Sequence, residues 1–172
     1  MPLIVEDGSI VVGADSYVST DAADTYHSDR ANTAWAAATA SAKEAALRKA
    51  TSYIDTKYAA RLRGFRVSAT QPLRWPRTGV ELDDLPFGSL AYLDYTTIPQ
   101  SLKDATCEAA IRFLAGDLSP DMPRGGKIES INVAGAISKK FMTNAPGATS
   151  YPVIDRLLAP LLNSPGTQLV RS

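Results

Sequence analysis

The chain has 172 residues, 45% of them hydrophobic and 21% charged, and its eighteen basic and eighteen acidic residues cancel. This composition is typical of one globular domain and excludes an intrinsically disordered chain. The neutral balance argues against coating duplex DNA as the main task, because such proteins gain affinity by replacing phosphate counterions with basic side chains. No apolar stretch approaches the ~20 residues needed to cross a bilayer, so we expect no membrane contact.

Two further features indicate the compartment. Glu6 and Asp7 stand where a signal peptide would carry positive charge, so we expect no export. Cys107 is the single cysteine, which excludes an internal disulfide and fits a reducing compartment.

The first sixty residues predict an extended segment followed by two helices. Residues 3–18 have extended character, and Ser19 is then a typical N-cap for a helix that ends near residue 30. Ser41 and Glu44 match a capping box at the start of the second helix. The apolar face of that helix repeats at helical spacing: Leu47, Thr51, Ile54 and Tyr58.

Residues 59–98 have no sustained period and contain several prolines and glycines, which predicts an ordered loop region with one short strand near residues 65–67. A loop of about forty residues is unusual inside a compact domain unless it is functional. We therefore expect this segment to present a surface that is shaped by contact with another molecule.

The second half predicts a helix from Pro99 to about Gly116 and a hairpin of two strands at residues 128–133 and 137–141. Ser150 is the expected cap of a last helix, which Pro160 should kink or end because proline lacks the amide hydrogen.

These elements predict a mainly α fold: a small bundle of about four helices with a short β-hairpin and extended N- and C-terminal arms. Residues 1–162 should form the single domain, and residues 163–172 should form a C-terminal arm. The core is expected from Leu47, Ile54, Tyr58, Leu102, Ala109, Phe113, Leu157 and Leu161.

Candidate chemistry is sparse. A nucleophile pair of Cys107 and His27, the only histidine, is unsupported by sequence spacing, and one cysteine with one histidine cannot supply a zinc site. The acidic pair Asp83-Asp84 lies in a loop, and Asp21 with Asp24 complements a helix dipole. We therefore expect no catalytic residue, no metal and no cofactor.

Charge is segregated in the central segment. Six basic residues and no acidic one lie between residues 57 and 77, with aromatic residues Tyr58, Phe65 and Trp75 among them. The balance reverses at Glu81, Asp83, Asp84 and Asp94. Three interpretations stay open: a surface that stacks and pairs single-stranded nucleic acid, opposed charges across a repeated subunit contact, or solvated loop charges with Trp75 in the core. The basic residues are Lys57, Arg61, Arg63, Arg66, Arg74 and Arg77.

The last ten residues are polar, interrupted by Pro165-Gly166, and end in Leu169-Val170. Chain ends are usually disordered unless they are tied down. We expect this arm to become ordered by binding a neighbour.

Short stretches along nearly the whole chain resemble a family of bacteriophage proteins. They are residues 3–8 (LIVEDG), 14–19 (ADSYVS), 32–35 (NTAW), 45–47 (AAL), 53–55 (YID), 73–77 (LRWPR), 98–99 (IP), 105–109 (ATCEA), 151–152 (YP), 157–162 (LLAPLL) and 169–171 (LVR). Members are commonly labelled DnaT-like single-stranded-DNA-binding proteins. They are also similar to the head-to-tail adaptor proteins, or head-completion and connector proteins, of tailed phages.

The second likeness implies a helical subunit in a ring of about twelve copies that surrounds the DNA channel. The implied partners are the portal protein, a neck, stopper or tail-completion protein, other copies of the chain, and double-stranded DNA in the channel. The implied location is the head–tail interface of the virion, after synthesis in the host cytoplasm. Neutral charge favours this structural role, with single-stranded DNA binding as the alternative.

Candidate site residues follow from this likeness and from the charge pattern. The arm that would bind the portal consists of Thr167, Gln168, Leu169, Val170 and Arg171. Subunit contacts or the channel lining would come from Arg61, Arg63, Arg66, Arg74, Trp75, Arg77, Asp83 and Asp84.

Overall fold

The computed structural model describes residues 2–82, 86, 91–120, 128–133, 137–141 and 150–163, with only the backbone of the 128–133 and 137–141 strands. These ranges are mainly helical, as the sequence predicts. The helices are α1 (Thr20–Ser28), α2 (Thr33–Ala36), α3 (Ala40–Lys57), α4 (Gln100–Ala115), α5 (Pro152–Leu158) and a final 3₁₀ turn (Ala159–Leu161). The strands are β1 (Phe65–Arg66), β2 (Arg77–Thr78), β3 (Ile128–Val133) and β4 (Ile137–Phe141).

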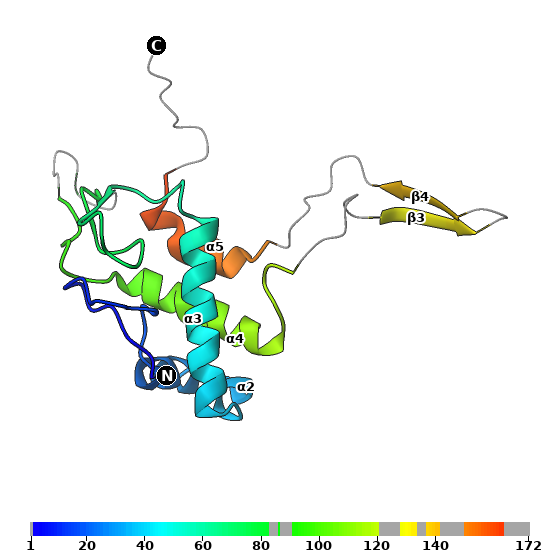
Figure 1. Cartoon of the computed structure of the whole chain (residues 1–172), viewed down its shortest axis with the longest axis horizontal. Helices are drawn as coiled ribbons and strands as arrows, with labels where there is room; N and C mark the ends of the chain where they lie inside the picture. The colour runs from blue at the N-terminus through cyan, green and yellow to red at the C-terminus, as the bar shows by residue number, and fades with distance from the viewer. Residues whose placement is uncertain are drawn as a thin grey trace, which may run out of the picture.

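Three helices form the centre of the fold. Helix α3 crosses α4, α5 lies against α4, and α1 and α2 cover one end of the bundle (Figure 1). Of the eight predicted core residues, six are buried: Leu47, Ile54, Tyr58, Leu102, Ala109 and Leu161. Phe113 and Leu157 are only half-buried against the core, which corrects the prediction for these two. Phe113 lies in the last turn of α4, where its ring and that of Tyr53 form a T-shaped pair.

The predicted N-cap is confirmed for α1 and wrong for α3. The Ser19 hydroxyl accepts a hydrogen bond from the Ala22 amide at 3.1 Å, which confirms the first cap. Helix α3 begins two residues earlier than predicted, because Thr39 has the extended backbone of a cap and accepts from the Ala42 amide at 3.3 Å. Ser41 is already helical, so the predicted capping box is wrong.

The last helix also starts differently from the prediction. Tyr151 is its N-cap and makes no side-chain cap hydrogen bond, while the Ser150 hydroxyl lies 3.1 Å from the Asp155 carboxylate. Pro160 does end the α-helix, since the chain tightens there into the 3₁₀ turn.

The central segment has little regular structure but is packed into the core. Strands β1 and β2 pair antiparallel, with Phe65 opposite Thr78 and Arg66 opposite Arg77, so the predicted strand near 65–67 is confirmed and its partner is new. Gly64 precedes β1 with φ +64°, and a Cβ there would lie 2.2 Å from the Thr78 carbonyl oxygen. Much of this segment is therefore shaped by the protein's own interior.

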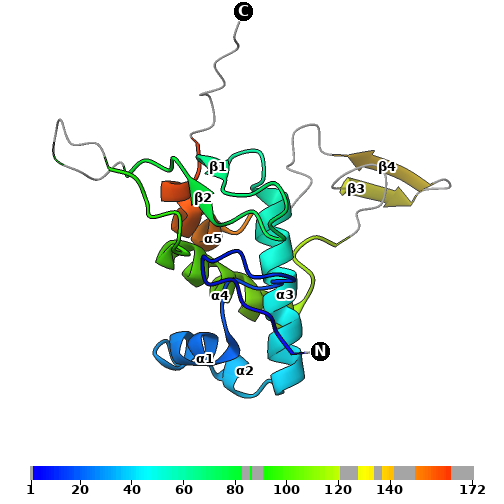
Figure 2. The same cartoon turned by 60° about the vertical axis from the view of Figure 1, so that its left-hand side comes forward.

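The N-terminal segment folds around one buried carboxylate. Glu6 is 1% exposed and accepts hydrogen bonds from the amides of Gly8, Ile10 and Val11 at 2.9–3.0 Å. The predicted extended character holds only in part, because the segment forms one isolated bridge between Val5 and Ser16. This loop lies beside α3 and the β1–β2 segment (Figure 2).

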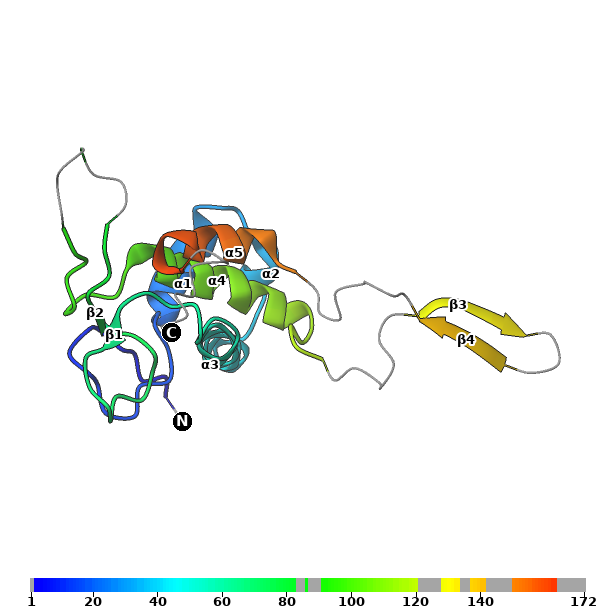
Figure 3. The same cartoon turned by 90° about the horizontal axis from the view of Figure 1, so that it is seen from above.

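The hairpin has the predicted limits, with a register irregularity between Ile128 and Ser130. Figures 1 and 3 show it apart from the helical body. Within the described ranges, no helix has the length and apolar character that a bilayer crossing requires.

Candidate nucleic-acid interface

A groove of about 550 Å³ lies between the N-terminal segment, α3 and the loop that joins β1 to β2. Most of its lining residues are charged or hydroxyl-bearing, and the rest are apolar. The lining residues are Ala14, Asp15, Arg48, Thr51, Ser52, Asp55, Thr56, Ala59, Arg66, Pro72, Leu73 and Arg74. Arg66 and Arg74 are predicted site residues that the fold brings together with Arg48, which sequence reasoning missed.

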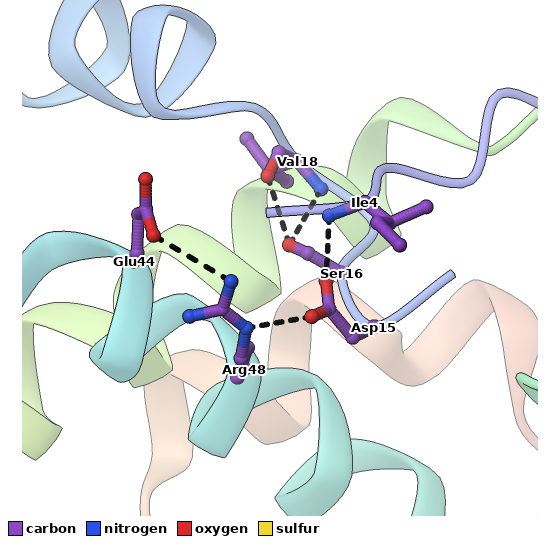
Figure 4. Close-up of polar contacts among 6 residues, drawn as sticks. All are labelled: Ile4, Asp15, Ser16, Val18, Glu44 and Arg48. Atoms are coloured by element: carbon purple, nitrogen blue, oxygen red, sulfur yellow. Dashed lines mark hydrogen bonds and ion pairs between the residues drawn. The ribbon is translucent and has the colours of Figure 1, made fainter. Parts of the chain in front are cut away.

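Arg48 is held by carboxylates at one side of the groove. Its Nε donates to Asp15 Oδ2 at 2.6 Å, and its Nη2 lies 3.5 Å from Glu44 Oε2, one helical turn earlier (Figure 4). Asp15 is itself fixed, because its Oδ1 accepts from the Ile4 amide at 2.9 Å. The positive charge of Arg48 is therefore largely compensated, and its guanidinium is positioned by the fold.

Asp55 attaches the far wall of the groove to α3. Its Oδ1 accepts from the Tyr17 hydroxyl at 2.5 Å, and its Oδ2 accepts from the Arg74 amide at 2.8 Å. Burial raises the pKa of Asp55, although the hydrogen bonds from Tyr17 and Arg74 oppose that rise. Burial, reinforced by the Asp55 charge, also raises the pKa of Tyr17 well above its usual value, so this hydroxyl keeps its proton.

The remaining groove arginines have unused donors. One Arg66 Nη donates to the Gln71 carbonyl, but its buried Nε has no hydrogen-bond partner among the described residues. Arg74 is exposed, and its guanidinium makes no hydrogen bond or ion pair within the part of the chain that the structure describes. Thr51, which is 0% exposed at the groove floor, likewise has an Oγ1 without a partner in the described ranges.

Two predicted contact residues lie inside the fold. Trp75 is 1% exposed, and its indole donates to the Thr97 carbonyl at 3.3 Å. Arg77 is 8% exposed and donates to four backbone carbonyls, those of Leu62, Arg63, Arg74 and Gly64. Burial lowers the pKa of Arg77. These placements correct the expectation that either side chain faces a partner. Trp75 lies in the core, as in the interpretation that treated the surrounding charges as solvated loop charges.

The other predicted contact residues are divided between the surface and the fold. Arg61 is exposed, whereas Arg63 is half-buried and its Nε donates to the Leu162 carbonyl at 3.1 Å. Asp83, Asp84 and the arm residues 167–171 lie outside the described residues.

Of the three aromatic residues in the basic segment, only Phe65 is exposed, at 76%. Tyr58 is buried and donates to Asp155 at 2.5 Å. Neighbouring residues of a strand point to opposite faces, so Phe65 lies on the other side of β1 from Arg66. An aromatic contact with a ligand would therefore come from outside the groove.

The Cys107 thiol is not activated as a nucleophile beside His27. Burial raises the pKa of the Cys107 thiol to about 12 and lowers the pKa of His27. His27 Nδ1 lies 2.9 Å from the Asn32 side-chain amide, which fixes the ring. Across the described ranges, no group of three or more His, Cys, Asp or Glu residues is placed to hold a metal ion.

Comparison with known proteins gives one finding. The model of the family described as "Putative DnaT-like ssDNA binding protein" matches residues 1–172, the whole chain. No curated protein and no solved structure matches significantly.

Proposed function

The chain belongs to this DnaT-like family, and on that premise we propose that it binds single-stranded DNA through the groove between α3 and the β1–β2 loop. The observation that carries the proposal is the pair Arg66 and Arg74, whose donors are partly unused and face one hollow together with Arg48. Guanidinium groups pair with phosphate oxygens, and the apolar wall can take an unstacked base.

The neutral net charge sets the expected strength. Only three arginines line the groove, and Arg48 is already ion-paired, so binding should be modest and local rather than a continuous coat. For single strands about 0.7 counterion is released per phosphate contact, which predicts a slope of log affinity against log salt of about −1.4 for Arg66 and Arg74, the two groove arginines without a carboxylate ion pair in the described ranges.

The test is fluorescence anisotropy of a labelled oligo-dT across a salt series, with the matching duplex as a second probe. Arg66→Gln with Arg74→Gln should weaken oligo-dT binding at least tenfold and flatten the slope. Arg156→Gln is the matched control, because Arg156 is exposed on α5 and does not line the groove. Arg63 is left unchanged, because it does not line the groove. Equal binding by the double variant and by the control would refute the groove as the binding surface.

A second candidate is a phage head-to-tail adaptor subunit, and the hairpin favours it. β3 and β4 pair with each other and stand apart from the helical body (Figure 3). A lone two-stranded hairpin is marginally stable in water, so a neighbouring molecule would be its natural support. Under this proposal, copies form a ring between the portal and the neck in the virion, around the double-stranded DNA, with the C-terminal arm on the portal.

Light scattering after size-exclusion chromatography, with and without portal protein, tests this candidate. The arm deletion should begin at residue 164, because the Asn163 amide donates to the Arg61 carbonyl at 2.7 Å and belongs to the fold. The shortened chain should fold and fail to bind the portal. A chain that stays monomeric and ignores the portal would exclude the adaptor.

A further inference from the structure

The groove floor has more hydrogen-bond donors than its own residues can satisfy. Thr51 Oγ1 and Arg66 Nε are buried without partners among the described residues, and both residues line the same groove as Arg74. Unsatisfied buried donors are rare in folded proteins, and each one calls for a partner such as a water or a ligand. The occupant of this site should therefore bring acceptor oxygens.

The carboxylates of the groove do not fill that need. Asp15 is committed to Arg48 and to the Ile4 amide, and Asp55 is committed to Tyr17 and the Arg74 amide. What the groove still offers is donor groups near its floor. A phosphate group matches them, because it presents several strong acceptor oxygens to arginine.

The remaining lining of the groove is apolar. Ala14, Ala59, Pro72 and Leu73 line it, and the volume of about 550 Å³ lies within the range of small-molecule sites. A base that is still paired and stacked in a duplex cannot leave its neighbours to enter such a hollow without the cost of unstacking. Unpaired bases avoid most of that cost.

We infer that the groove holds one unstacked nucleotide, with its phosphate on Arg66 and Arg74 and its base against Pro72 and Leu73. This inference rests on the proposed function and adds to it the unit that is recognised and the reason that single strands are preferred. It also assigns Thr51 a role as a positioning donor at the groove floor.

The first experiment measures binding of dTMP and of inorganic phosphate, each alone and as a competitor of labelled oligo-dT. We expect dTMP to displace oligo-dT and to bind at least tenfold more tightly than inorganic phosphate, since the base adds apolar contact. Arg74→Gln should weaken dTMP binding roughly tenfold, as expected for a charged hydrogen bond. Arg156→Gln should leave it unchanged. Equal affinity for dTMP and phosphate would overturn the nucleotide assignment.

The second experiment uses Thr51→Val, which keeps the side-chain shape and removes the unpartnered hydroxyl. Without ligand, the variant should melt at the same or a higher temperature, because an unsatisfied buried group is lost. Its affinity for dTMP should nevertheless fall severalfold. A purely structural Thr51 would leave dTMP affinity unchanged, and that result would overturn the role of the groove floor.

Failure of this inference can be told apart from failure of the proposed function. If oligo-dT binds but Arg74→Gln and Thr51→Val have no effect, single-stranded DNA is held elsewhere and the inference is overturned. If oligo-dT does not bind while dTMP does, and the two variants weaken dTMP binding, the nucleotide site is supported and the proposed DNA-binding function falls.

Discussion

Two regions built from the same basic stretch of sequence use their arginines in opposite ways. At the junction of β1, β2 and the chain's last described residues, Arg77 donates to four carbonyls and Arg63 donates to the Leu162 carbonyl. In the groove, the Arg74 guanidinium makes no hydrogen bond or ion pair to any residue that the structure describes, and Arg66 keeps one unpartnered nitrogen. The first region is structural, and the second has binding capacity left.

The difference shows that a run of basic residues is not by itself evidence of a ligand surface. Arg74 and Arg77 are three positions apart, in a stretch of sequence that also contains Pro72 and Pro76. Their roles differ because one guanidinium meets backbone carbonyls that would otherwise lack donors, whereas the other meets solvent. Accounting for donors and acceptors in the fold therefore separates the two roles, and counting charges does not.

The largest expected effect comes from breaking the structural region. Arg77→Leu leaves several backbone carbonyls without their donor, so we expect it to lower the free energy of unfolding by about 3 kcal/mol. Urea denaturation followed by circular dichroism measures this change. Arg77→Lys is the informative companion, because lysine keeps the charge but cannot supply a planar fork to several carbonyls. If Arg77→Lys were as stable as the wild type, charge and not hydrogen-bond geometry would be what this position contributes.

The fold was largely predictable where one periodic pattern controls both local structure and packing. Leu47, Thr51 and Ile54 are spaced for one helix face, and all three are buried, with Thr51 also lining the groove. The hairpin limits were also predictable, because two short stretches with isoleucine, valine and phenylalanine flank Ala134-Gly135 in the sequence. The cap of α3 was missed because Thr39 and Ser41 are both good caps, and only the backbone conformation of Thr39 decides between them.

An intermediate effect is expected at Asp55, which lies between the two regions. Its carboxylate accepts from the Arg74 amide and from the Tyr17 hydroxyl, and that hydroxyl accepts from the Trp75 amide. Asp55→Asn replaces one acceptor oxygen with an NH₂ group, which would face either the Tyr17 hydroxyl or the Arg74 amide, both of them donors to Asp55. We expect a loss of about 1–2 kcal/mol in the free energy of unfolding at neutral pH. Because the loop would also loosen, the affinity for oligo-dT should fall with it.

The pH dependence of this effect has a defined sign. Burial makes the pKa of Asp55 higher in the fold than in the unfolded chain, where it is near 3.8. The folded state then holds the proton more tightly, so this group stabilises the fold most below pH 3.8 and loses that contribution as pH rises through its raised pKa. The stability of the wild type minus that of Asp55→Asn should therefore fall as pH rises from 3.8. A difference that rises over this range would mean that the hydrogen bonds outweigh burial.

The candidate groove could be predicted only in part. The basic run contains Arg66 and Arg74, but Arg48 and Asp15 come from distant parts of the chain and meet only in the folded state. The burial of Trp75 was one of the interpretations left open by the sequence. The alternation of apolar and charged residues from Leu73 through Arg74 to Trp75 favours it, and the structure buries the first and third of these side chains and exposes the second. No comparable sequence pattern predicts that Arg77 is buried. Its hydrogen-bond partners are backbone carbonyls, which every residue has, so no particular residue type in the sequence points to them.

The smallest effect on stability is expected at Arg74, and it sharpens the comparison most. Arg74→Gln removes an exposed guanidinium without hydrogen bonds to the described residues, so the free energy of unfolding should change by no more than about 0.5 kcal/mol. The Arg74 amide, which bonds to Asp55, is untouched by the substitution. Urea denaturation and oligo-dT anisotropy on the same preparation measure stability and binding together. Arg77→Leu should lose stability, whereas Arg74→Gln should lose affinity alone. If Arg74→Gln instead lost stability and kept its affinity, both regions would be structural, and the binding surface would have to lie outside the basic stretch.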